Sequence, residues 1–293
     1  MRLFAIRIPD DLVPDETFDK LATLIEQPGR DRLRRYRLPE DSLRALVARL
    51  TVTWYLYINK LLQPGELPTF GRKGKGKPTL TTPHLSPPLE FNNTHESSYI
   101  LFTTLSSPSP LSSVGIDIML QPRPSEVYDI QEGITDQLTL LERRSLAVPM
   151  RGEGRARRIS LMWALKEGFT KAVGEGITFG MERIEVHLNE ERKAENGVPQ
   201  VGVKGGGEDQ EQEIKVDKVL IDGKDANQIG WEWKIGEIDN VRKGEKERYS
   251  WAVWWRGEVV ELSQRSLELE HVPWDNFVAP LLELAEDMQK RNK

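Results

Sequence analysis

The spacing of apolar residues along the chain predicts a mixture of helices and strands. Apolar positions recur at helical spacing in five stretches, which we expect to form helices: 15–26, 41–62, 130–146, 155–173 and 273–293. Alternating or short apolar runs predict strands at 2–8, 89–92, 98–104, 114–119, 181–188, 218–221 and 230–235. Residues 249–263 are predicted to form a β-hairpin that turns at Arg256-Gly257.

Polar and proline-rich segments separate these elements. Residues 63–88 are expected to be loop, and the Ser/Pro/Leu segment 105–113 is the clearest linker. We therefore divide the chain into an N-terminal part, 1–110, and a C-terminal part, 111–293. Within the second part, residues 189–217 are dense in Glu, Lys and Gly, and we expect them to form a poorly ordered insertion between strands. A strand-then-helix layout appears in each half, without a clear internal repeat.

The composition is that of a soluble globular protein. Of the 293 residues, 38% are hydrophobic and none is cysteine, which excludes disulfides, thiolate zinc sites and a cysteine nucleophile. No apolar run approaches the roughly 18 residues that a membrane helix needs. The N-terminal apolar run contains an arginine, so we expect neither a signal peptide nor an anchor. The expected location is the cytoplasm.

Positive charge is concentrated locally. The net charge of −5 gives no global indication of nucleic-acid binding. Six arginines nevertheless lie between Arg30 and Arg44, and four cations lie between Arg72 and Lys77 without an acid. This distribution favours a discrete anionic ligand. Arg44 lies near the start of a predicted helix, where a cation is unfavourable unless an anion is also present, or else it is simply solvated.

The cationic segment G-R-K-G-K-G-K at 71–77 partly matches a phosphate-binding loop. Pro78 stands where that motif requires Ser or Thr, and a helix cannot start cleanly there. We therefore disfavour a phosphate-loop nucleotide hydrolase. What remains is either a loop whose amides and lysines wrap a phosphate or an ordinary solvated loop.

Three further patterns carry candidate chemistry. F-N-N-T-H at 91–95 places a histidine at a strand end, where it is either a ligand or structural. Asp117 lies in an aliphatic strand. If its side chain points to the buried face of the strand, it needs a cation or a metal nearby; if it points to the solvated face, it needs no partner. Trp163, Glu167 and Lys171 are spaced by four and share one helix face. The side chains of that face either bind a metal and a phosphate and transfer a proton, or form an ordinary charged helix surface.

With G-K-P at 76–78, these patterns follow the order of a known family. The chain resembles the 4′-phosphopantetheinyl transferases over residues 30–185, specifically the long surfactin-synthetase type in its eukaryotic, fungal-like subgroup. R-R-Y-R-L-P-E-D-S-L-R at 34–44 is similar to the arginine-rich start of the family's long N-terminal helix. The G-x-D and W-x-x-K-E-x-x-x-K motifs match at Gly115, Asp117, Trp163, Lys166, Glu167 and Lys171.

The resemblance implies an α/β (α+β) fold of two similar subdomains related by pseudo-twofold symmetry, with the site between them. It implies Mg²⁺-dependent transfer of the 4′-phosphopantetheine of coenzyme A to a serine of an acyl or peptidyl carrier protein, releasing 3′,5′-ADP. It also implies a monomer without nucleic-acid or membrane partners. The sequence leaves the carriers open among fatty-acid, polyketide, peptide-synthetase and lysine-pathway proteins. A non-catalytic coenzyme A or nucleotide-binding module is the alternative.

The resemblance also assigns roles to single residues. Asp117 and Glu167 are expected to hold the Mg²⁺ together with water, and Glu167 to take the serine proton directly or through a water. Lys171 is expected to reach the pyrophosphate as a point charge. The residues expected to bind the cofactor are Arg44, Arg72, Lys75, Gly76, Lys77, Pro78, Asn93, Thr94, His95 and Lys171.

One position departs from the family pattern, and several others stay open. Many members carry a third acid two residues after the strand aspartate, where this chain has Met119, a ligand too soft for magnesium. Lys166 lies about 100° around the helix from Glu167, so it faces either the surface or the cofactor. Trp163 is expected to pack.

Two surfaces are candidates for partner contacts. The arginine cluster at 30–37, with Arg32 as a candidate, either docks an acidic carrier protein or binds coenzyme A. The Trp-rich segment 249–263 is either a docking surface or part of the core, and aromatic residues favour the core.

Overall fold

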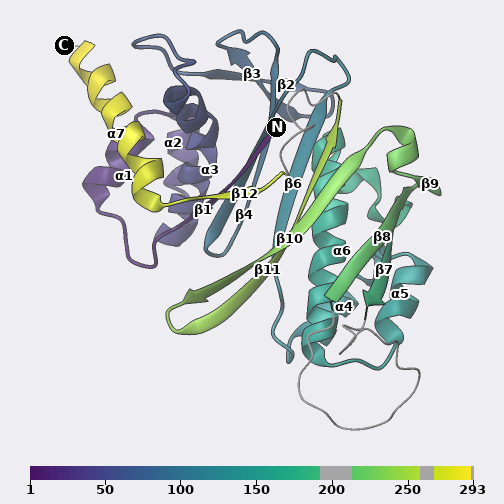
Figure 1. Cartoon of the computed structure of the whole chain (residues 1–293). Coiled ribbons are helices and arrows are strands. Elements are labelled where there is room, and N and C mark those ends of the chain that lie inside the picture. The colour runs from purple at the N-terminus through teal and green to yellow at the C-terminus, as the bar shows by residue number, and fades with distance from the viewer. Residues whose placement is uncertain (192–212, 258–266, 292–293) are drawn as a thin grey trace, which may run out of the picture.

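The computed structural model describes residues 1–191, 213–257 and 267–291. Two sheets face each other in the middle of the molecule, and helices cover the outer face of each (Figure 1). Three buried clusters fill the layers, one between each sheet and its helices and one between the two sheets. The mixed α/β class expected from the sequence is confirmed.

The first sheet has the order β12-β1-β5-β4. β1 (Arg2–Arg7) pairs with β5 (Tyr99–Ser106), β5 pairs with β4 (Leu89–Glu96), and β12 (Leu269–Val272) joins β1 in parallel. Phe4, Trp54, Phe102 and Phe277 lie in the core on its outer side. The helices over that side are α1 (Asp15–Ala22), α2 (Gln27–Leu33), α3 (Pro39–Ile58) and α7 (Trp274–Arg291).

The second sheet has the order β10-β11-β6. It consists of β10 (Glu232–Arg242), β11 (Glu245–Arg256) and β6 (Ser113–Leu120), all antiparallel. Helix α6 (Gly152–Val173) packs along it. Within the described residues, the remaining elements of this half are α4 (Val127–Gly133), α5 (Leu140–Ala147), β7 (Ile184–Glu191), β8 (Glu213–Ile221), β9 (Lys224–Asp225) and four 3₁₀ turns (Thr135–Gln137, Gly176–Phe179, Met181–Arg183, Asn227–Ile229).

Both halves have the same topology. The chain runs β1–α3–β4–β5 in the first half and β6–α6–β10–β11 in the second, and in each sheet the first strand pairs with the last. This repetition, which the sequence hides, is the two-part fold that the family resemblance implies. The boundary at residue 110 stays a prediction. However, β12 and α7 belong to the first half, because Val272 and Phe277 lie in its core.

Strand β11 is buried on both faces. Trp251, Val253 and Trp255 lie in the cluster between the sheets, and Ala252 and Trp254 lie in the cluster under α6. Alternating side chains point to opposite faces of a strand, so the aromatics on both faces follow from this central position. The core interpretation of the Trp-rich segment is confirmed for these residues, and the docking interpretation is wrong for them.

The predicted hairpin has a different partner. β11 pairs with β10, which precedes it, through a turn at Lys243 and Gly244, whose φ values are +49° and +84°. Two positive φ values are typical of the tight turns that match strand twist. The predicted second strand at 258–263 lies outside the described residues.

Other predicted boundaries of helices and strands also differ from those in the structure. Residues 63–88 are not all loop, because β2 (Thr69–Lys73) and β3 (Lys77–Thr82) pair within them. The helix predicted over 15–26 ends at Ala22, and Pro28 lies in the first turn of α2, where proline is tolerated. Thr139 and Glu142 form a capping box that starts α5 and so divides the predicted helix 130–146. The ends of the predicted insertion 189–217 belong to β7 and β8, and residues 192–212 lie outside the described part.

Two glycines allow the second sheet to approach α6 closely, Gly115 at β6 and Gly168 at β11. A methyl group on Gly115 would lie 2.2 Å from the amide nitrogen of Ala172 and 2.3 Å from the carbonyl oxygen of Gly168. One on Gly168 would lie 3.2 Å from the carbonyl oxygen of Ala252. The glycine of the G-x-D motif is therefore required by backbone packing.

We predict that Gly115→Ala lowers the free energy of unfolding by about 3 kcal/mol or more, because the new methyl group overlaps backbone that cannot move independently. Gly154→Ala is the matched control, since it lies in α6 with open space around it; it is expected to change stability by less than about 1 kcal/mol. Urea unfolding measures both. Equal stability of the two variants would contradict the packing argument.

Candidate active site

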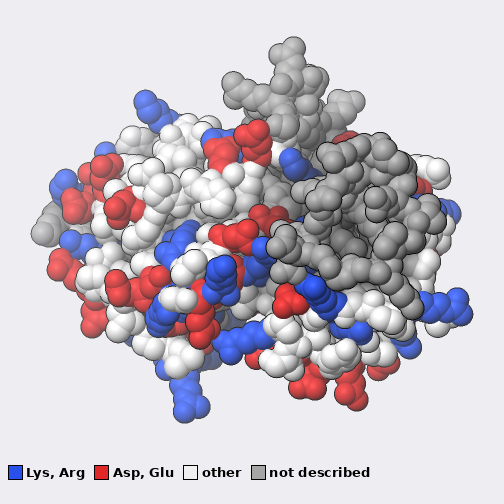
Figure 2. Space-filling model, turned by 60° about the horizontal axis from the view of Figure 1, so that its bottom comes forward, with Lys and Arg blue, Asp and Glu red and all other residues white. Residues whose placement is uncertain are grey.

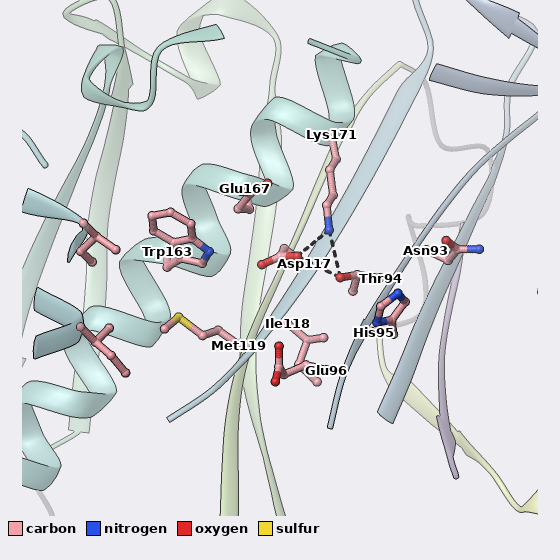
Figure 3. A pocket seen from close by; sticks show the side chains of 12 residues that line it. Asn93, Thr94, His95, Glu96, Asp117, Ile118, Met119, Trp163, Glu167 and Lys171 are labelled. Atoms are coloured by element: carbon pink, nitrogen blue, oxygen red, sulfur yellow. Dashed lines mark hydrogen bonds and ion pairs between the residues drawn. The ribbon is translucent and has the colours of Figure 1, made fainter. Parts of the chain in front are cut away.

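A cavity of about 670 Å³ lies where the two halves meet. It is lined by β4 from the first half and by β6, α4, α6 and residues near them from the second. Its polar wall contains Asn93, Thr94, His95, Glu96, Asp117, Glu167 and Lys171, and its apolar wall contains Ile118, Met119, Ile130, Ile134 and Trp163. Figure 3 shows these side chains converging from separate elements.

Asp117 is the centre of the polar wall. Its Oδ1 accepts a hydrogen bond from Lys171 Nζ at 2.6 Å and one from Thr94 Oγ1 at 2.9 Å. Lys171 Nζ also donates to Thr94 Oγ1 at 2.9 Å, which closes a triangle between α6, β6 and β4 (Figure 3). Asp117 is buried, so the cation beside it offsets the cost of its desolvation. The alternative of a solvated aspartate is wrong.

Two more carboxylates share the cavity. Burial raises the pKa of Glu167, and the charge of Asp117 raises it further. Burial also raises the pKa of Glu96, again with a contribution from Asp117. Sequence reasoning missed Glu96, although strand alternation places it on the same side of β4 as Thr94. Among the described residues, no three acids or histidines are close enough to form a ready-made metal cluster.

His95 and Arg44 lie at the first-half side of the cavity. Desolvation of the ring, followed by the charges of Arg44 and Lys171, lowers the pKa of His95. Arg44 does not line the cavity itself. It is held by Asp41 at 2.8 Å and by Glu40 at 3.9 Å. These two acids offset the unfavourable position of Arg44 near the start of α3.

The two asparagines of F-N-N-T-H act first as connectors. Asn92 Oδ1 accepts from the amide of Ile116 at 3.0 Å, so it ties β4 to β6 across the junction of the halves. Asn93 Nδ2 donates to the carbonyl of Ala48 at 2.7 Å and to Thr51 Oγ1 at 3.1 Å in α3. Asn93 also lines the cavity. Asn92 was not among the residues predicted for the site.

The face of α6 predicted from residue spacing is confirmed. Trp163, Glu167 and Lys171 all line the cavity. Trp163 is half-buried there and lies outside the buried core cluster under α6, so its expected packing role is wrong.

Lys166 faces neither the surface nor the cofactor. It is completely buried, and its Nζ pairs with Glu142 Oε2 at 2.8 Å. It also donates to the carbonyl of Met181 at 2.9 Å and to that of Ile184. Burial lowers the pKa of Lys166, and Glu142 opposes that change. Both open alternatives for Lys166 are therefore wrong.

The cationic β2–β3 hairpin does not line the cavity. Arg72 is exposed and donates to the carbonyl of Gly76 at 2.9 Å, and Lys75 pairs with Glu175 at 2.7 Å. Lys77 is buried, and its Nζ donates to Ser113 Oγ at 2.7 Å and to two carbonyls, of Val114 and Ala172, at 2.8 and 2.9 Å. Lys77 opens a strand and not a helix, which further disfavours a phosphate-loop hydrolase. The cofactor contacts assigned to Arg72, Lys75, Gly76, Lys77 and Pro78 stay predictions.

Charges on the surface are mixed. Lysine and arginine side chains lie beside aspartate and glutamate over the face shown in Figure 2. The arginines of the 30–37 cluster are mainly exposed, Arg32 included. No helix within the described ranges has the length and hydropathy to cross a bilayer.

Comparison with known proteins identifies the family. A model of the 4′-phosphopantetheinyl transferase superfamily matches residues 113–212, and a model of the N-terminal part of 4′-phosphopantetheinyl transferase matches residues 14–107. A 4′-phosphopantetheinyl transferase from Paxillus involutus is 32% identical over 206 residues, which cover 67% of this chain and 77% of that protein. This chain belongs to the 4′-phosphopantetheinyl transferase superfamily. The resemblance inferred from the motifs is thereby confirmed.

Other proteins that match this chain are less similar to it in sequence. An L-aminoadipate-semialdehyde dehydrogenase-phosphopantetheinyl transferase from Xenopus laevis is 27% identical over 75% of this chain and 71% of its own length. A crystal structure of a holo-(acyl-carrier-protein) synthase from Bacillus anthracis in complex with coenzyme A is 20% identical, covers 50% of this chain and 96% of its own, and superposes with a TM-score of 0.26. The match over residues 14–107 includes the cavity residues of β4. The match over residues 113–212 includes those of β6 and α6.

We predict that the buried Lys77 makes stability depend on pH. Burial lowers the pKa of Lys77 to about 8, below its value in the unfolded chain, so between these values the unfolded state binds more protons and stability rises with pH. The unfolding free energy of the wild type, relative to Lys77→Met, should rise by roughly 2 kcal/mol between pH 7 and pH 10. Lys75→Met, in the exposed pair with Glu175, is the control. Denaturation at several pH values measures the difference, and a flat difference would contradict the assignment.

Proposed function

We propose that the protein transfers the 4′-phosphopantetheine of coenzyme A to a serine hydroxyl of an acyl or peptidyl carrier protein, releasing 3′,5′-ADP. The observation that carries this proposal is the convergence of Asp117, Glu167 and Lys171 with Thr94 and His95 around one cavity. These residues come from motifs in both halves of the chain. Membership of the transferase superfamily supports the reaction class.

The donor set of the cavity fits Mg²⁺. Lys171 Nζ lies 2.6 Å from Asp117 Oδ1, which supports a cation-binding role for this carboxylate. Asp117 and Glu167 would hold the metal, and Mg²⁺ accepts one or two carboxylates when water completes its octahedron. Glu96 is a third carboxylate on the same wall, although the expected third acid is replaced by Met119. When bound, Mg²⁺ would offset negative charge on the pyrophosphate.

The residues of the chain supply binding and proton transfer. In the reaction, the serine oxygen bonds to the phosphorus next to pantetheine, and the bond from that phosphorus to the oxygen of 3′,5′-ADP breaks. Glu167 takes the serine proton, and its raised pKa makes it a stronger base than an ordinary carboxylate. Lys171 is placed to offset charge on the pyrophosphate. His95 and Arg44 are proposed to bind the remaining phosphates.

The same cavity supports several finer proposals. Its apolar wall, with Ile130, Ile134 and Trp163, suits the methyl-bearing pantetheine arm. Both walls come from one chain, which supports an active monomer. The absence of cysteine fits a cytoplasmic enzyme. The Xenopus relative's name includes L-aminoadipate-semialdehyde dehydrogenase, so that enzyme is a candidate acceptor beside carrier domains of fatty-acid, polyketide and peptide synthases.

We predict that the purified protein, incubated with coenzyme A, Mg²⁺ and an apo carrier domain, increases the carrier mass by one phosphopantetheine group. Glu167→Gln should reduce kcat by at least about 100-fold, because the general base is lost. Mass spectrometry and initial rates measure both effects.

Glu153→Gln is the matched control, because Glu153 lies exposed at the start of the same helix. Its rate is expected to equal that of the wild type. Coenzyme A binding without transfer to any of several carriers would favour the non-catalytic binding module. Near-normal transfer by Glu167→Gln would refute the assignment of the base.

We also predict that a chelator abolishes transfer and that added Mg²⁺ restores it. Asp117→Asn should weaken Mg²⁺ binding in the presence of coenzyme A, since one anionic oxygen ligand is lost. Isothermal titration calorimetry measures this binding independently of the reaction. Full activity in excess chelator would overturn the metal assignment.

A further inference from the structure

The end of the β10–β11 hairpin reaches from the second half to the first. β6 pairs with β11 only from Tyr249 to Arg256, so residues 240–248 extend beyond the three-stranded sheet. We call these residues the arm. Figure 1 shows the arm projecting below the sheet of the first half. Arg7 of β1 fixes it there by donating to Asn240 Oδ1 at 3.0 Å and to the carbonyl of Val241 at 3.2 Å.

Arg242 of the arm contacts two separate elements of the first half. Its Nη2 donates to Glu40 Oε2 at 2.7 Å, in the first turn of α3. Its Nη1 donates to Ser97 Oγ at 3.0 Å, in the turn between β4 and β5. The hydrogen bond from Arg242 lowers the pKa of Glu40, although burial opposes it. The guanidinium therefore joins α3 to the β4–β5 turn, using two of the donors of its planar fork.

The turn that Arg242 holds is strained. Ser97 has φ +44°, a conformation that favours glycine. Glu247 of the arm accepts from Ser97 Oγ at 3.0 Å and from Ser98 Oγ at 2.9 Å. Burial alone would raise the pKa of Glu247, but its hydrogen bonds outweigh burial and lower it. The arm thus supplies contacts that stabilise a turn whose sequence does not favour it.

Both elements lead directly to the cavity. His95 and Glu96 immediately precede the strained turn and line the cavity. Arg44 lies one helical turn after Glu40 and is paired with it. Helix α3 packs against β4, and Asn93 of β4 donates to the carbonyl of Ala48 in α3, so the two elements meet at this place.

We propose that Arg242 is a positioning residue for coenzyme A. By tying the start of α3 to the β4–β5 turn, it fixes the separation of Arg44 and His95, the two groups proposed to bind phosphates of the cofactor. Arg242 itself does not line the cavity. The proposal rests on the proposed function, and it assigns the arm a role in cofactor affinity and not in the chemical step.

The test is a kinetic comparison of three variants at saturating carrier and at saturating coenzyme A. Arg242→Met removes both hydrogen bonds with little change in length, and Arg242→Lys keeps the charge. Arg123→Met is the matched control, because Arg123 pairs at 2.9 Å with Glu245 of the same arm in an exposed position. Arg242→Met should raise KM for coenzyme A roughly tenfold, with kcat and KM for the carrier within about twofold, because a displaced binding group weakens ground-state contacts.

Arg242→Lys is expected to recover part of the affinity, and Arg123→Met to match the wild type. An unchanged KM for coenzyme A in Arg242→Met would overturn the proposal, and so would a loss confined to kcat. If Arg242→Met does not fold, Ser97→Ala removes the contact of Arg242 with the β4–β5 turn and leaves the pairs of Arg44 intact, and its KM decides. Absence of transfer by the wild type would instead refute the proposed function.

Discussion

The backbone of β6 lies against α6 more closely than any side chain at Gly115 would allow. This close approach brings Asp117 of the strand within 2.6 Å of Lys171 of the helix. A bulkier residue at position 115 would separate the two elements and also part the carboxylate from its cation. The rest of the site depends on this contact, because Thr94 joins the pair from the opposite half. Packing and electrostatics are here two aspects of one constraint.

Buried polar contacts hold α6 on both sides of the face that lines the cavity. Lys166 and Glu142 form an ion pair without solvent access, and Glu142 also accepts from the amide of Val186 at 2.8 Å. Lys77 binds the carbonyl of Ala172 near the C-terminal end of the same helix. Rotation or sliding of α6 would leave these groups buried and unpaired, which costs several kcal/mol. Lys77 and Lys166 thus hold the helix that carries Glu167 and Lys171.

Sequence reasoning reached the site through motifs whose spacing has a physical cause. The four-residue spacing of Trp163, Glu167 and Lys171 predicted their common face, because helix geometry is local. The burial of Lys77 and Lys166 was not predicted, since charge alone does not tell whether a side chain points into the core. The β2–β3 hairpin was missed because its glycines and lysines obscure strand alternation. Pairing of β11 with β10 was also missed, since it is decided by contacts between distant segments.

The return of the C-terminal segment to the first half has a consequence for how this chain matures. Val272 and Phe277 lie in the same core as Phe4, so the core around β1 is completed only by residues near the C-terminal end of the chain. During synthesis, the first half emerges with an unfilled apolar surface on its sheet. Its assembly must therefore follow the translation of the second half. The nascent protein depends on that delay being short or on protection of the exposed surface by chaperones.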